Sequence, residues 1–281
     1  MKKLISIIIP THNKSSYLDV TLHSYMTFKI QHEIIIVDDG SQDSTKNIIS
    51  KYKNFLNIRY IYQNNYGLSK ARNTGAKYAT GNYLLFMDDD RIILNDYLNV
   101  LQPSENIVLI GYRRELYIKD LINNINNIKD CIALFPDSLK NSSYYERYFR
   151  KVLPLYSLKN ISIPWVGCTF SNTLISSKIF CEIGGFDENF NGWGFEDLEL
   201  AYRIFKTYNT EPIYFKLSKQ MINYHLFHGH SNNLFSERQN NFNYFCNKHN
   251  QPEVLMYEKF SNNTIDIVRY NDLFMDEVCK I

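Results

Sequence analysis

The sequence predicts an α/β protein: a mostly parallel open sheet flanked by helices, followed by a second half of divergent composition. In the first hundred residues, short apolar runs alternate with amphipathic segments. Continuous runs such as Ile-Ile-Ile-Val at 34–37 are typical of strands covered on both faces, as in parallel sheets with crossover helices. Right-handed crossovers then give an open doubly wound sheet, in which ligands bind beyond the carboxyl ends of the strands.

The elements expected in the first half alternate between strand and helix. Strands are expected at Leu4–Pro10, Glu33–Asp38, Ile58–Gln63 and Tyr83–Met87. Helices are expected at Ser15–Phe28, Asp43–Tyr52 and Leu68–Ala79. The residues at the strand ends are therefore the ones in which to look for a site.

The second half departs from this pattern at about residue 112, where Asn, Tyr and Lys become frequent. The elements expected there are helices at Asp120–Phe135, Ser143–Val152, Ser177–Ile183 and Glu196–Lys206, and a strand at Thr169–Ser176. The last thirty residues, after Pro252, lack clear periodicity. We therefore expect one domain over residues 1–251, divided into halves 1–111 and 112–251, and a C-terminal extension at 252–281.

Composition excludes several classes of protein. The net charge is only +2 and no basic block runs along the chain, which argues against nucleic-acid binding. The five cysteines are odd in number and form no CxxC pair, which is typical of reduced intracellular thiols. The apolar run before Pro10 is too short for a signal peptide, and no segment approaches the ~20 apolar residues of a membrane span. We expect a soluble, cytoplasmic protein.

Three carboxylates, Asp88, Asp89 and Asp90, end the apolar run Tyr83–Met87. Like charges at one strand exit repel each other unless a cation compensates them. Oxygen ligands suit Mg²⁺ or Mn²⁺, which commonly bridge protein carboxylates and substrate phosphates. Because side chains alternate along an extended chain, Asp88 and Asp90 would point the same way. A solvated acidic turn is the alternative.

Two further segments of the first half carry candidate ligand-binding residues. Asp38 and Asp39 leave a strand just before Gly40, and they could accept hydrogen bonds from a base or a ribose, although helix capping also explains a polar cluster there. Lys70 and Arg72 near a helix start could meet phosphate, but the residues alone favour a solvated helix face. No GxGxxG motif follows the first strand, so the chain lacks a dinucleotide fingerprint.

In the second half, glycines flank Trp193 directly before Glu196 and Asp197. The glycines free the backbone to place a large ring where it could stack on a sugar. A carboxylate held at this point could act as a general base, although acids in a first helical turn are also favoured by the helix dipole. Three histidines follow within six residues, His225, His228 and His230, and one of them could complete a metal site.

Taken in order, these segments resemble the GT-A glycosyltransferases, which have a Rossmann-like fold, and specifically those of family 2. The segments that carry the resemblance are Pro10-Thr11-His12-Asn13, Val37-Asp38-Asp39-Gly40-Ser41, Ala71-Arg72-Asn73-Thr74-Gly75, Met87-Asp88-Asp89-Asp90, and Gly185-Phe186-Asp187 through Glu196-Asp197-Leu198-Glu199-Leu200. The last of these is similar to a motif of β-1,4-galactosyltransferases and bacterial chondroitin and capsule polymerases. The resemblance spans about residues 4–230 and implies a nucleotide-binding half and an acceptor-binding half.

The resemblance implies a role for each matching residue. Donor contacts would come from Pro10, Thr11 and Asp39 around the uracil, Arg72 at its edge, Asp38 near the base or ribose, Asp88 near the ribose or metal, and Trp193 and Gly194 as the sugar and diphosphate wall. Metal ligands would be Asp90, Asp88 and His225, with His228 as the alternative. Asp197 would be the catalytic base, and Glu196 and Trp193 would contact the acceptor. The DxD motif does not require Asp89.

The implied activity is inverting transfer of a sugar from a UDP-sugar to an acceptor hydroxyl, with Mn²⁺ or Mg²⁺ as cofactor. The acceptor would be a saccharide of the bacterial surface, a lipid-linked saccharide or a peptide. The alternatives are a nucleotidyltransferase, which would want a glycine-rich basic loop after the first strand, and a non-catalytic carbohydrate-binding or scaffold protein. The segment Lys140–Lys151, with four basic residues and one acidic, favours a solvated helix over peripheral contact with the inner face of a membrane.

Overall fold

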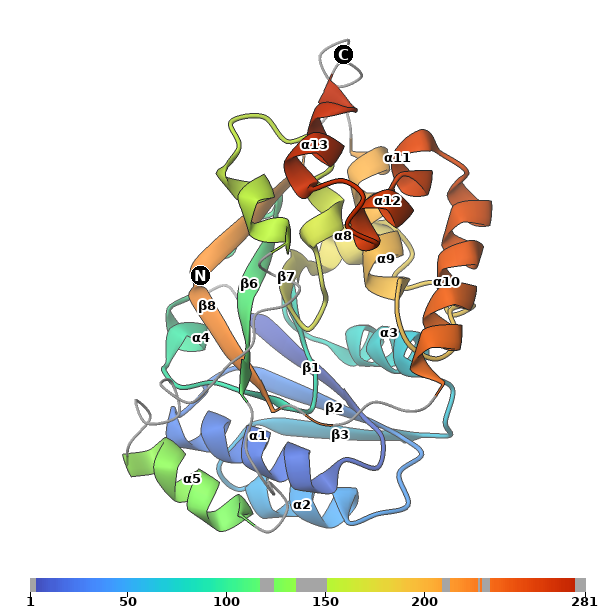
Figure 1. Cartoon of the computed structure of the whole chain (residues 1–281). Coiled ribbons are helices and arrows are strands. Elements are labelled where there is room, and N and C mark those ends of the chain that lie inside the picture. Colours follow the sequence, from blue (N-terminus) through green and yellow to red (C-terminus); the bar gives the residue numbers. More distant parts are fainter. Residues whose placement is uncertain are drawn as a thin grey trace.

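A computed structural model describes residues 4–116, 124–134, 151–208, 213–226, 228 and 233–275. An eight-stranded sheet in the order β3-β2-β1-β4-β7-β6-β8-β5 runs through the centre of the molecule (Figure 1). The strands are β1 (Ile5–Thr11), β2 (Glu33–Asp39), β3 (Ile58–Gln63), β4 (Tyr83–Met87), β5 (Arg91–Ile92), β6 (Ile107–Leu116), β7 (Asn172–Ser176) and β8 (Tyr214–Leu226).

Helices lie on both sides of this sheet. Those of the first half are α1 (Ser15–Thr27), α2 (Thr45–Tyr52), α3 (Leu68–Tyr78) and α4 (Tyr97–Val100), and the second half begins with α5 (Ile125–Leu134). Those that follow are the short 3-10 helices η1 (Leu153–Ser157) and η2 (Pro164–Gly167), then α8 (Ser177–Glu182), α9 (Glu196–Thr207), α10 (Leu234–His249), α11 (Pro252–Leu255), α12 (Tyr257–Ser261) and α13 (Ile267–Asp272). Among the described residues, no helix is both long and apolar enough to cross a membrane.

The prediction of a mostly parallel open sheet is confirmed. Strand β1 pairs in parallel with β2 and β4, and β2 pairs in parallel with β3. The second half adds β7, which runs antiparallel between β4 and β6, and β8, which runs parallel to β6. All four strands and three helices expected in the first half are present, with ends that differ by one or two residues.

Three sizeable elements were not expected: β6, β8 and α10. Strand β8 is exposed along much of its first half, where Lys216, Ser218, Lys219 and Gln220 interrupt any apolar alternation. The helix expected at Asp120–Phe135 is confirmed over Ile125–Leu134, and residues 117–123 and 135 lie outside the described part. The helix expected at Ser143–Val152 also lies outside it, except for its last two residues.

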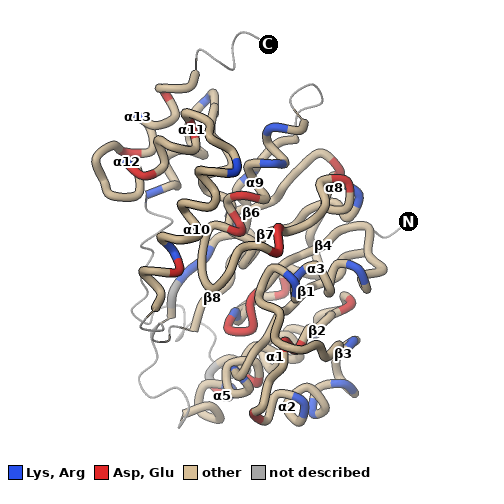
Figure 2. The backbone as a smooth tube through the Cα atoms, turned by 90° about the vertical axis from the view of Figure 1, so that its right-hand side faces the viewer, with Lys and Arg blue, Asp and Glu red and all other residues tan. Residues whose placement is uncertain are grey.

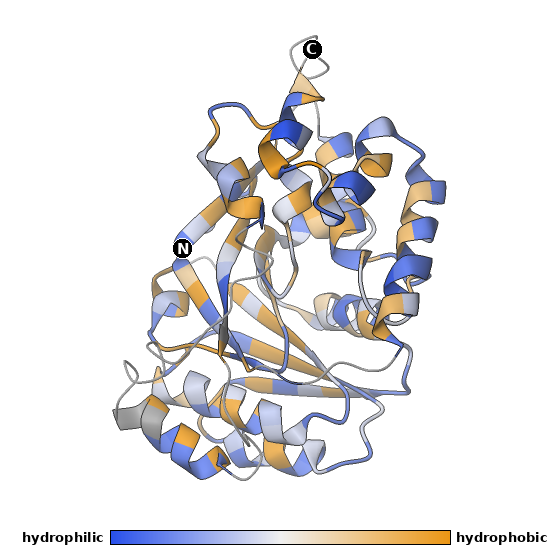
Figure 3. Cartoon of the chain, in the orientation of Figure 1, coloured by the Kyte–Doolittle hydropathy of each residue, from blue (hydrophilic) through white to orange (hydrophobic). Residues whose placement is uncertain are grey.

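The alternation of side chains along each strand divides the core into two layers. On β1, Ile5, Ile7 and Ile9 pack with helices α1 and α2, whereas Ile8 belongs to the cluster on the opposite face. Figure 3 shows hydrophobic residues concentrated on the central strands, as two covered faces require. Helix α3 lies so close to the opposite face that a Cβ on Gly75 would stand 2.5 Å from Ile8 Cγ2. The glycine therefore permits this approach.

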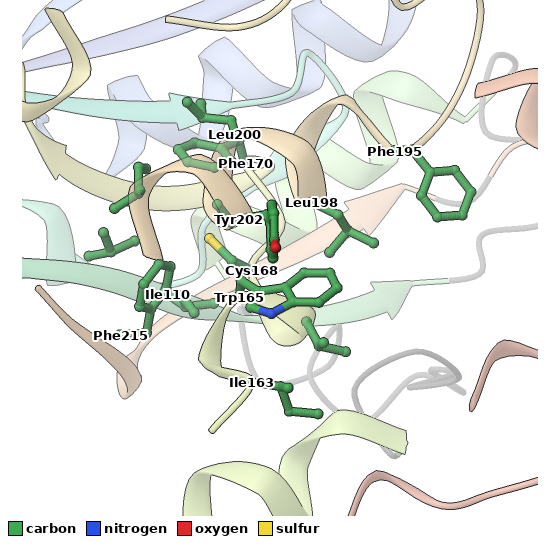
Figure 4. Close-up of a cluster of buried hydrophobic side chains, with 14 of the residues drawn as sticks. Ile110, Ile163, Trp165, Cys168, Phe170, Phe195, Leu198, Leu200, Tyr202 and Phe215 are labelled. Atoms are coloured by element: carbon green, nitrogen blue, oxygen red, sulfur yellow. The ribbon is translucent and has the colours of Figure 1, made fainter. Parts of the chain in front are cut away.

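The second layer is an aromatic core built largely by the second half of the chain. Trp165 is fully buried at its centre, with Tyr202 of α9 at a ring-centroid distance of 5.2 Å and Cys168 nearby (Figure 4). The residues after Pro252 form the short helices α11–α13, and Tyr257 and Tyr270 are buried in the same cluster. This segment, which lacks periodicity in the sequence, therefore packs against the aromatic core through apolar side chains of all three helices.

A buried carboxylate fixes α9 to the C-terminal end of α10. Glu199 is fully buried and pairs with Arg203 at 2.8 Å, Lys248 at 2.7 Å and His249 at 3.0 Å. Burial alone would raise the pKa of Glu199, but hydrogen bonds from His249, Arg203 and Lys248 outweigh it and lower the pKa to about 2. Because the folded-state pKa is lowered, the stabilisation is present above pH 4.5 and is lost as the pH falls toward 2.

We expect Glu199→Gln to lower the free energy of unfolding by about 3 kcal/mol or more at pH 7, since it removes the buried carboxylate that pairs with Arg203 and Lys248. The deficit relative to wild type should shrink as the pH falls from 4.5 toward 2. Urea denaturation at several pH values measures it, with the exposed Glu258→Gln as control. A deficit that does not depend on pH would contradict the electrostatic explanation.

Candidate active site

A cleft of about 840 Å³ lies where the strand ends of the first half face helix α9. Its walls carry six carboxylates and six basic side chains. The acids are Asp39, Asp88, Asp89, Asp90, Glu196 and Asp197, and the bases are Lys14, Arg72, Arg91, Arg113, Lys151 and Arg238. Figure 2 shows acidic segments gathered in the middle of the molecule, between the elements around β1 and the helices of the second half.

Arg72 connects the two sides of this cleft. Its guanidinium is 2% exposed and lies 3.0 Å from Asp88 after β4, and 2.8 Å from Asp197 in the first turn of α9. Glu196 lies 3.4 Å from the same group. The solvated helix face favoured by the residues alone is thus wrong for Arg72. The prediction of a solvated helix face is correct for Lys70, whose side chain is 43% exposed.

The acids after β4 are held by different cations. Arg91 and Arg72 flank Asp88 at 3.2 and 3.0 Å, and their charges outweigh burial and lower the pKa of Asp88. Asp89 accepts a hydrogen bond from Thr11 at 2.8 Å, and burial raises its pKa to about 7. The carboxylates therefore do not form a solvated acidic turn.

Asp90 forms a compact cluster with two histidines. One ligand atom from each of Asp90, His225 and His228 lies within 4.8 Å of the others. His225 Nε2 and His228 Nε2 approach Asp90 Oδ2 at 3.4 and 3.0 Å. Burial and then the charge of Arg91 lower the pKa of His225 to about 4, so the ring is neutral near pH 7, as a metal ligand must be. His228, the alternative ligand, thus lies beside Asp90 together with His225, whereas His230 is outside the described residues.

The cluster fits a divalent cation. Asp90 Oδ1 is buried and has no hydrogen-bond partner among the described residues, although Arg91 Nε lies 3.4 Å away. One carboxylate and two imidazoles form a donor set suited to Mn²⁺. Lys14 already places a positive charge here, with its Nζ 2.9 Å from Asp90 Oδ2 and 2.8 Å from His228 Nε2. Asp88 stands apart from the cluster because its oxygens face Arg72 and Arg91.

The two acids at the end of β2 hold the loop that borders the cleft. Asp39 accepts hydrogen bonds from Gln63 and from the backbone N–H groups of Tyr66 and Gly67, at 2.7–2.9 Å. Asp38 accepts from Ser41 N and Tyr60 Oη, both at 2.8 Å, and does not line the cleft. Contact between Asp38 and a donor stays a prediction, and this geometry favours a role in shaping the loop.

The Gly-Trp-Gly loop is held in an unusual backbone conformation. Gly192 and Gly194 have φ of +71° and +100°, and Phe195, which is not a glycine, has φ of +72°. Such backbone is costly for a bulky residue and persists only where the surroundings enforce it. The Phe195 ring is anchored against Phe242 at 5.1 Å. Trp193 is 45% exposed at the cleft, and its backbone N–H donates a hydrogen bond to Glu237 Oε2 at 3.0 Å.

Glu196 and Asp197 open helix α9 inside the cleft. Asp197 Oδ1 pairs with Arg72, and its Oδ2 accepts from Phe170 N at 3.0 Å. Burial raises the pKa of Asp197. Burial and then the charge of Asp197 raise the pKa of Glu196 to about 7, and Glu196 Oε2 has no hydrogen-bond partner among the described residues. Both carboxylates therefore take up a proton more readily than they would in water.

All predicted site residues except Asp38 line this one cleft. They are Pro10, Thr11, Asp39, Arg72, Asp88, Asp90, Trp193, Gly194, Glu196, Asp197, His225 and His228. Sequence reasoning assigned no role to Lys14, Arg91, Arg113, Lys151 or Arg238, which line it as well. Lys14 directly follows the Pro10–Asn13 motif and Arg91 directly follows the Met87–Asp90 motif. These positions were the one sequence feature that could have identified them as site residues. Asn73 was also unassigned: it exchanges two hydrogen bonds with Phe186 and fixes α3 to the glycine segment.

The sequence models of two protein families match the chain. Residues 6–104 match the sequence model of glycosyl transferase family 2, and residues 154–228 match that of the N-terminal domain of galactosyltransferase. The chain belongs to glycosyl transferase family 2. Chondroitin synthase of Escherichia coli is 29% identical over 242 residues, which cover 79% of this glycosyltransferase and 34% of that protein. Validoxylamine A glucosyltransferase of Streptomyces hygroscopicus subsp. jinggangensis is 30% identical over 218 residues, or 72% and 51% of the two chains.

Solved structures confirm the GT-A fold of this glycosyltransferase. S. aureus TarS in complex with UDP-GlcNAc superimposes with a TM-score of 0.58 at 18% identity, over 92% of this chain and 73% of that one. GalNAc-T7 with UDP, GalNAc and Mn²⁺ gives a TM-score of 0.58 at 17% identity, over 87% and 48%. The chain spans about a third to a half of the two sequence relatives named above.

We expect Arg72→Met, studied in metal-free buffer, to lower the free energy of unfolding by about 3–5 kcal/mol at pH 8, because the buried Glu196 and the half-buried Asp88 and Asp197 lose their shared cation. The deficit should shrink as the pH falls and the carboxylates become protonated. Thermal or urea unfolding at pH 5 and pH 8 measures this, with the exposed neighbour Lys70→Met as control. Equal stability of Arg72→Met and wild type at pH 8 would show that Arg72 does not compensate these acids.

Proposed function

We propose that this glycosyltransferase transfers a sugar from a UDP-sugar to an acceptor hydroxyl with inversion at the anomeric carbon, assisted by Mn²⁺ or Mg²⁺. The observation that carries the proposal is that the Arg72 guanidinium pairs with both Asp197 and Asp88. Asp197 therefore lies close to the corner formed by Asp88–Asp90. The candidate base and the candidate metal corner thus face each other across one cleft. This is the arrangement that a single displacement needs, with the base on one side of the sugar and the leaving group on the other.

The donor would lie along the first-half wall of the cleft. Pro10, Thr11 and the Asp39-held loop border the space for the base, and Trp193 offers an exposed ring to the sugar. Asp90, His225 and His228 would hold the cation, which neutralises the charge that develops on the departing diphosphate. A TarS structure with UDP-GlcNAc and a GalNAc-T7 structure with UDP and Mn²⁺ support this class of donor and cofactor.

Asp197 is the proposed general base. Its orientation is fixed by Arg72 and Phe170 N, and its raised pKa makes it a stronger base than a solvent-exposed aspartate. Glu196, with one free oxygen, would accept a hydrogen bond from the acceptor. No protein nucleophile is required, because one displacement completes the reaction.

The two alternative functions have less support. A nucleotidyltransferase would want a glycine-rich basic loop after β1, where this chain has Thr11-His12-Asn13. A non-catalytic scaffold would not need buried acids with raised pKa values at Glu196 and Asp197. We further propose one catalytic domain, with a nucleotide-binding half at 1–111, an acceptor-binding half at 112–251, and residues 252–281 as an extension. The basic segment 140–150, a candidate membrane contact, lies outside the described residues.

Titration calorimetry with UDP and Mn²⁺ tests the donor and cofactor assignment. We expect UDP to bind tightly only when Mn²⁺ or Mg²⁺ is present, and chelator to abolish turnover of the matching UDP-sugar. His225→Ala and Asp90→Asn should each weaken metal-dependent UDP binding, whereas Asp96→Asn, at an exposed position outside the cleft, should not. Metal-independent UDP release that survives Asp90→Asn would contradict the role of this corner.

Replacing Asp197 and Glu196 in separate variants identifies which of them is the general base. We expect Asp197→Asn to reduce UDP-sugar turnover by ~10²-fold or more while donor affinity is kept, the scale of general-base catalysis. Glu196→Gln should act mainly on the KM of the acceptor. UDP-release kinetics and donor titration measure both effects. The reverse result, with turnover lost in Glu196→Gln and kept in Asp197→Asn, would transfer the role of base to Glu196.

A further inference from the structure

The second half of the chain contributes a cationic corner to the cleft. Six lining residues come from position 151 and from helices α10 and α12: Lys151, Leu234, Arg238, Tyr257, Phe260 and Ser261. Two of these six are cations and none is an acid. All six carboxylates of the cleft lie on the other elements, at the ends of β2 and β4 and at the start of α9.

The two cations converge on one residue, Ser261 at the end of α12. Lys151 Nζ lies 3.5 Å from the Ser261 carbonyl oxygen, and Arg238 Nη2 donates to Ser261 Oγ at 2.9 Å. Neither cation forms an ion pair with any described residue. Glu237, which neighbours Arg238 in the chain, is turned toward the Gly-Trp-Gly loop, where it accepts from Trp193 N. At the other end of the cleft, Lys14, Arg72 and Arg91 each form ion pairs with carboxylates.

Arg238 is held in place rather than free in solvent. Its guanidinium carbon lies 5.1 Å from the centre of the buried Phe195 ring, which fixes the plane of the group. Only one of its N–H groups is used by a described hydrogen bond, so the others remain available. The stem of Arg238 also passes beside Gly194: a Cβ built there would stand 3.7 Å from Arg238 Cγ. The corner therefore borders Trp193 and the acids that open α9.

We infer that this corner binds an anionic group, carboxylate or phosphate, carried by the acceptor on or next to the sugar that receives the transferred residue. The inference rests on the proposed function, because it assigns the donor to the first-half wall and leaves this end of the cleft to the acceptor. A held guanidinium and an ammonium that share one neighbour form a site for a group with two or more oxygens. Tyr257 and Phe260 beside them give the same corner an aromatic floor for a sugar ring.

Three probes of similar size test the charge preference by titration calorimetry: a uronate-containing disaccharide, a sugar–phosphate dimer and a neutral disaccharide. Each is titrated with UDP and Mn²⁺ present and again without nucleotide. We expect at least one anionic probe to bind about tenfold more tightly than the neutral one, the scale of a charged hydrogen bond. The preferred anion identifies the source, and the preference should fall with added salt.

Variants locate the preference. Lys151→Met and Arg238→Gln should each reduce it, and the double variant should abolish it while leaving affinity for UDP within about twofold of wild type. Arg238→Lys should keep part of it, and Lys178→Met, whose side chain is 76% exposed on α8, should keep all of it. Equal binding of the three probes would overturn the inference. So would a double variant that weakens UDP as much as the anionic probe, which would assign the cations to the donor diphosphate. Failure of wild type to bind UDP would contradict the proposed function alone, since the probes are also titrated without nucleotide.

Discussion

The compensation of buried carboxylates by shared cations is the constraint on which the site depends. Six acids line a single cleft, and most of them are largely removed from water. Isolated charges in such a place would be expensive, so each must be paired or neutralised. Arg72 pairs with three acids from the two halves of the chain. Lys14 and Arg91 pair with Asp90 after β4. The cleft is thus held together by charges as much as by packing.

This arrangement relates the fold to the site. The parallel strands β1, β2 and β4 end at one edge of the sheet. The topology of the sheet is therefore enough to bring Thr11, Asp39 and Asp88 to the same edge. Helix α9 must then present Glu196 and Asp197 to the same edge. It does so because Phe195 is anchored in the aromatic core and Glu199 is tied to α10, so that both ends of the first turn are fixed. The strained backbone at Phe195 is compatible with this anchoring.

The sequence predicted the elements and site residues whose signals are local. Continuous apolar runs identified β1, β2 and β4, and the polar residues directly after them identified most of the cleft. For Arg72 the residues alone favoured a solvated helix face, because a basic residue near a helix start is usually solvated. Only the family resemblance assigned it to the site, and only the fold shows three acids around it. Lys14 and Arg91 carried no pattern of their own. Strand β8 was missed because its exposed first half lacks alternation, although its last residues deliver His225 to Asp90.

Several residues that sequence patterns miss lie at the end of the cleft opposite the acids. The motifs account for the acids, which lie at the end of the cleft where we propose that the donor and the metal bind. The opposite end is built from α10, α12 and Lys151, segments without a motif, and its cations converge on Ser261 through contacts between residues 110 and 23 positions apart. Among the described residues, Lys14, Arg72 and Arg91 pair with carboxylates of the protein, whereas Lys151 and Arg238 form no ion pair. Charge among the described residues is therefore divided along the cleft: the acids and the cations paired with them lie at one end, and Lys151 and Arg238 lie at the other, where we propose that the acceptor binds.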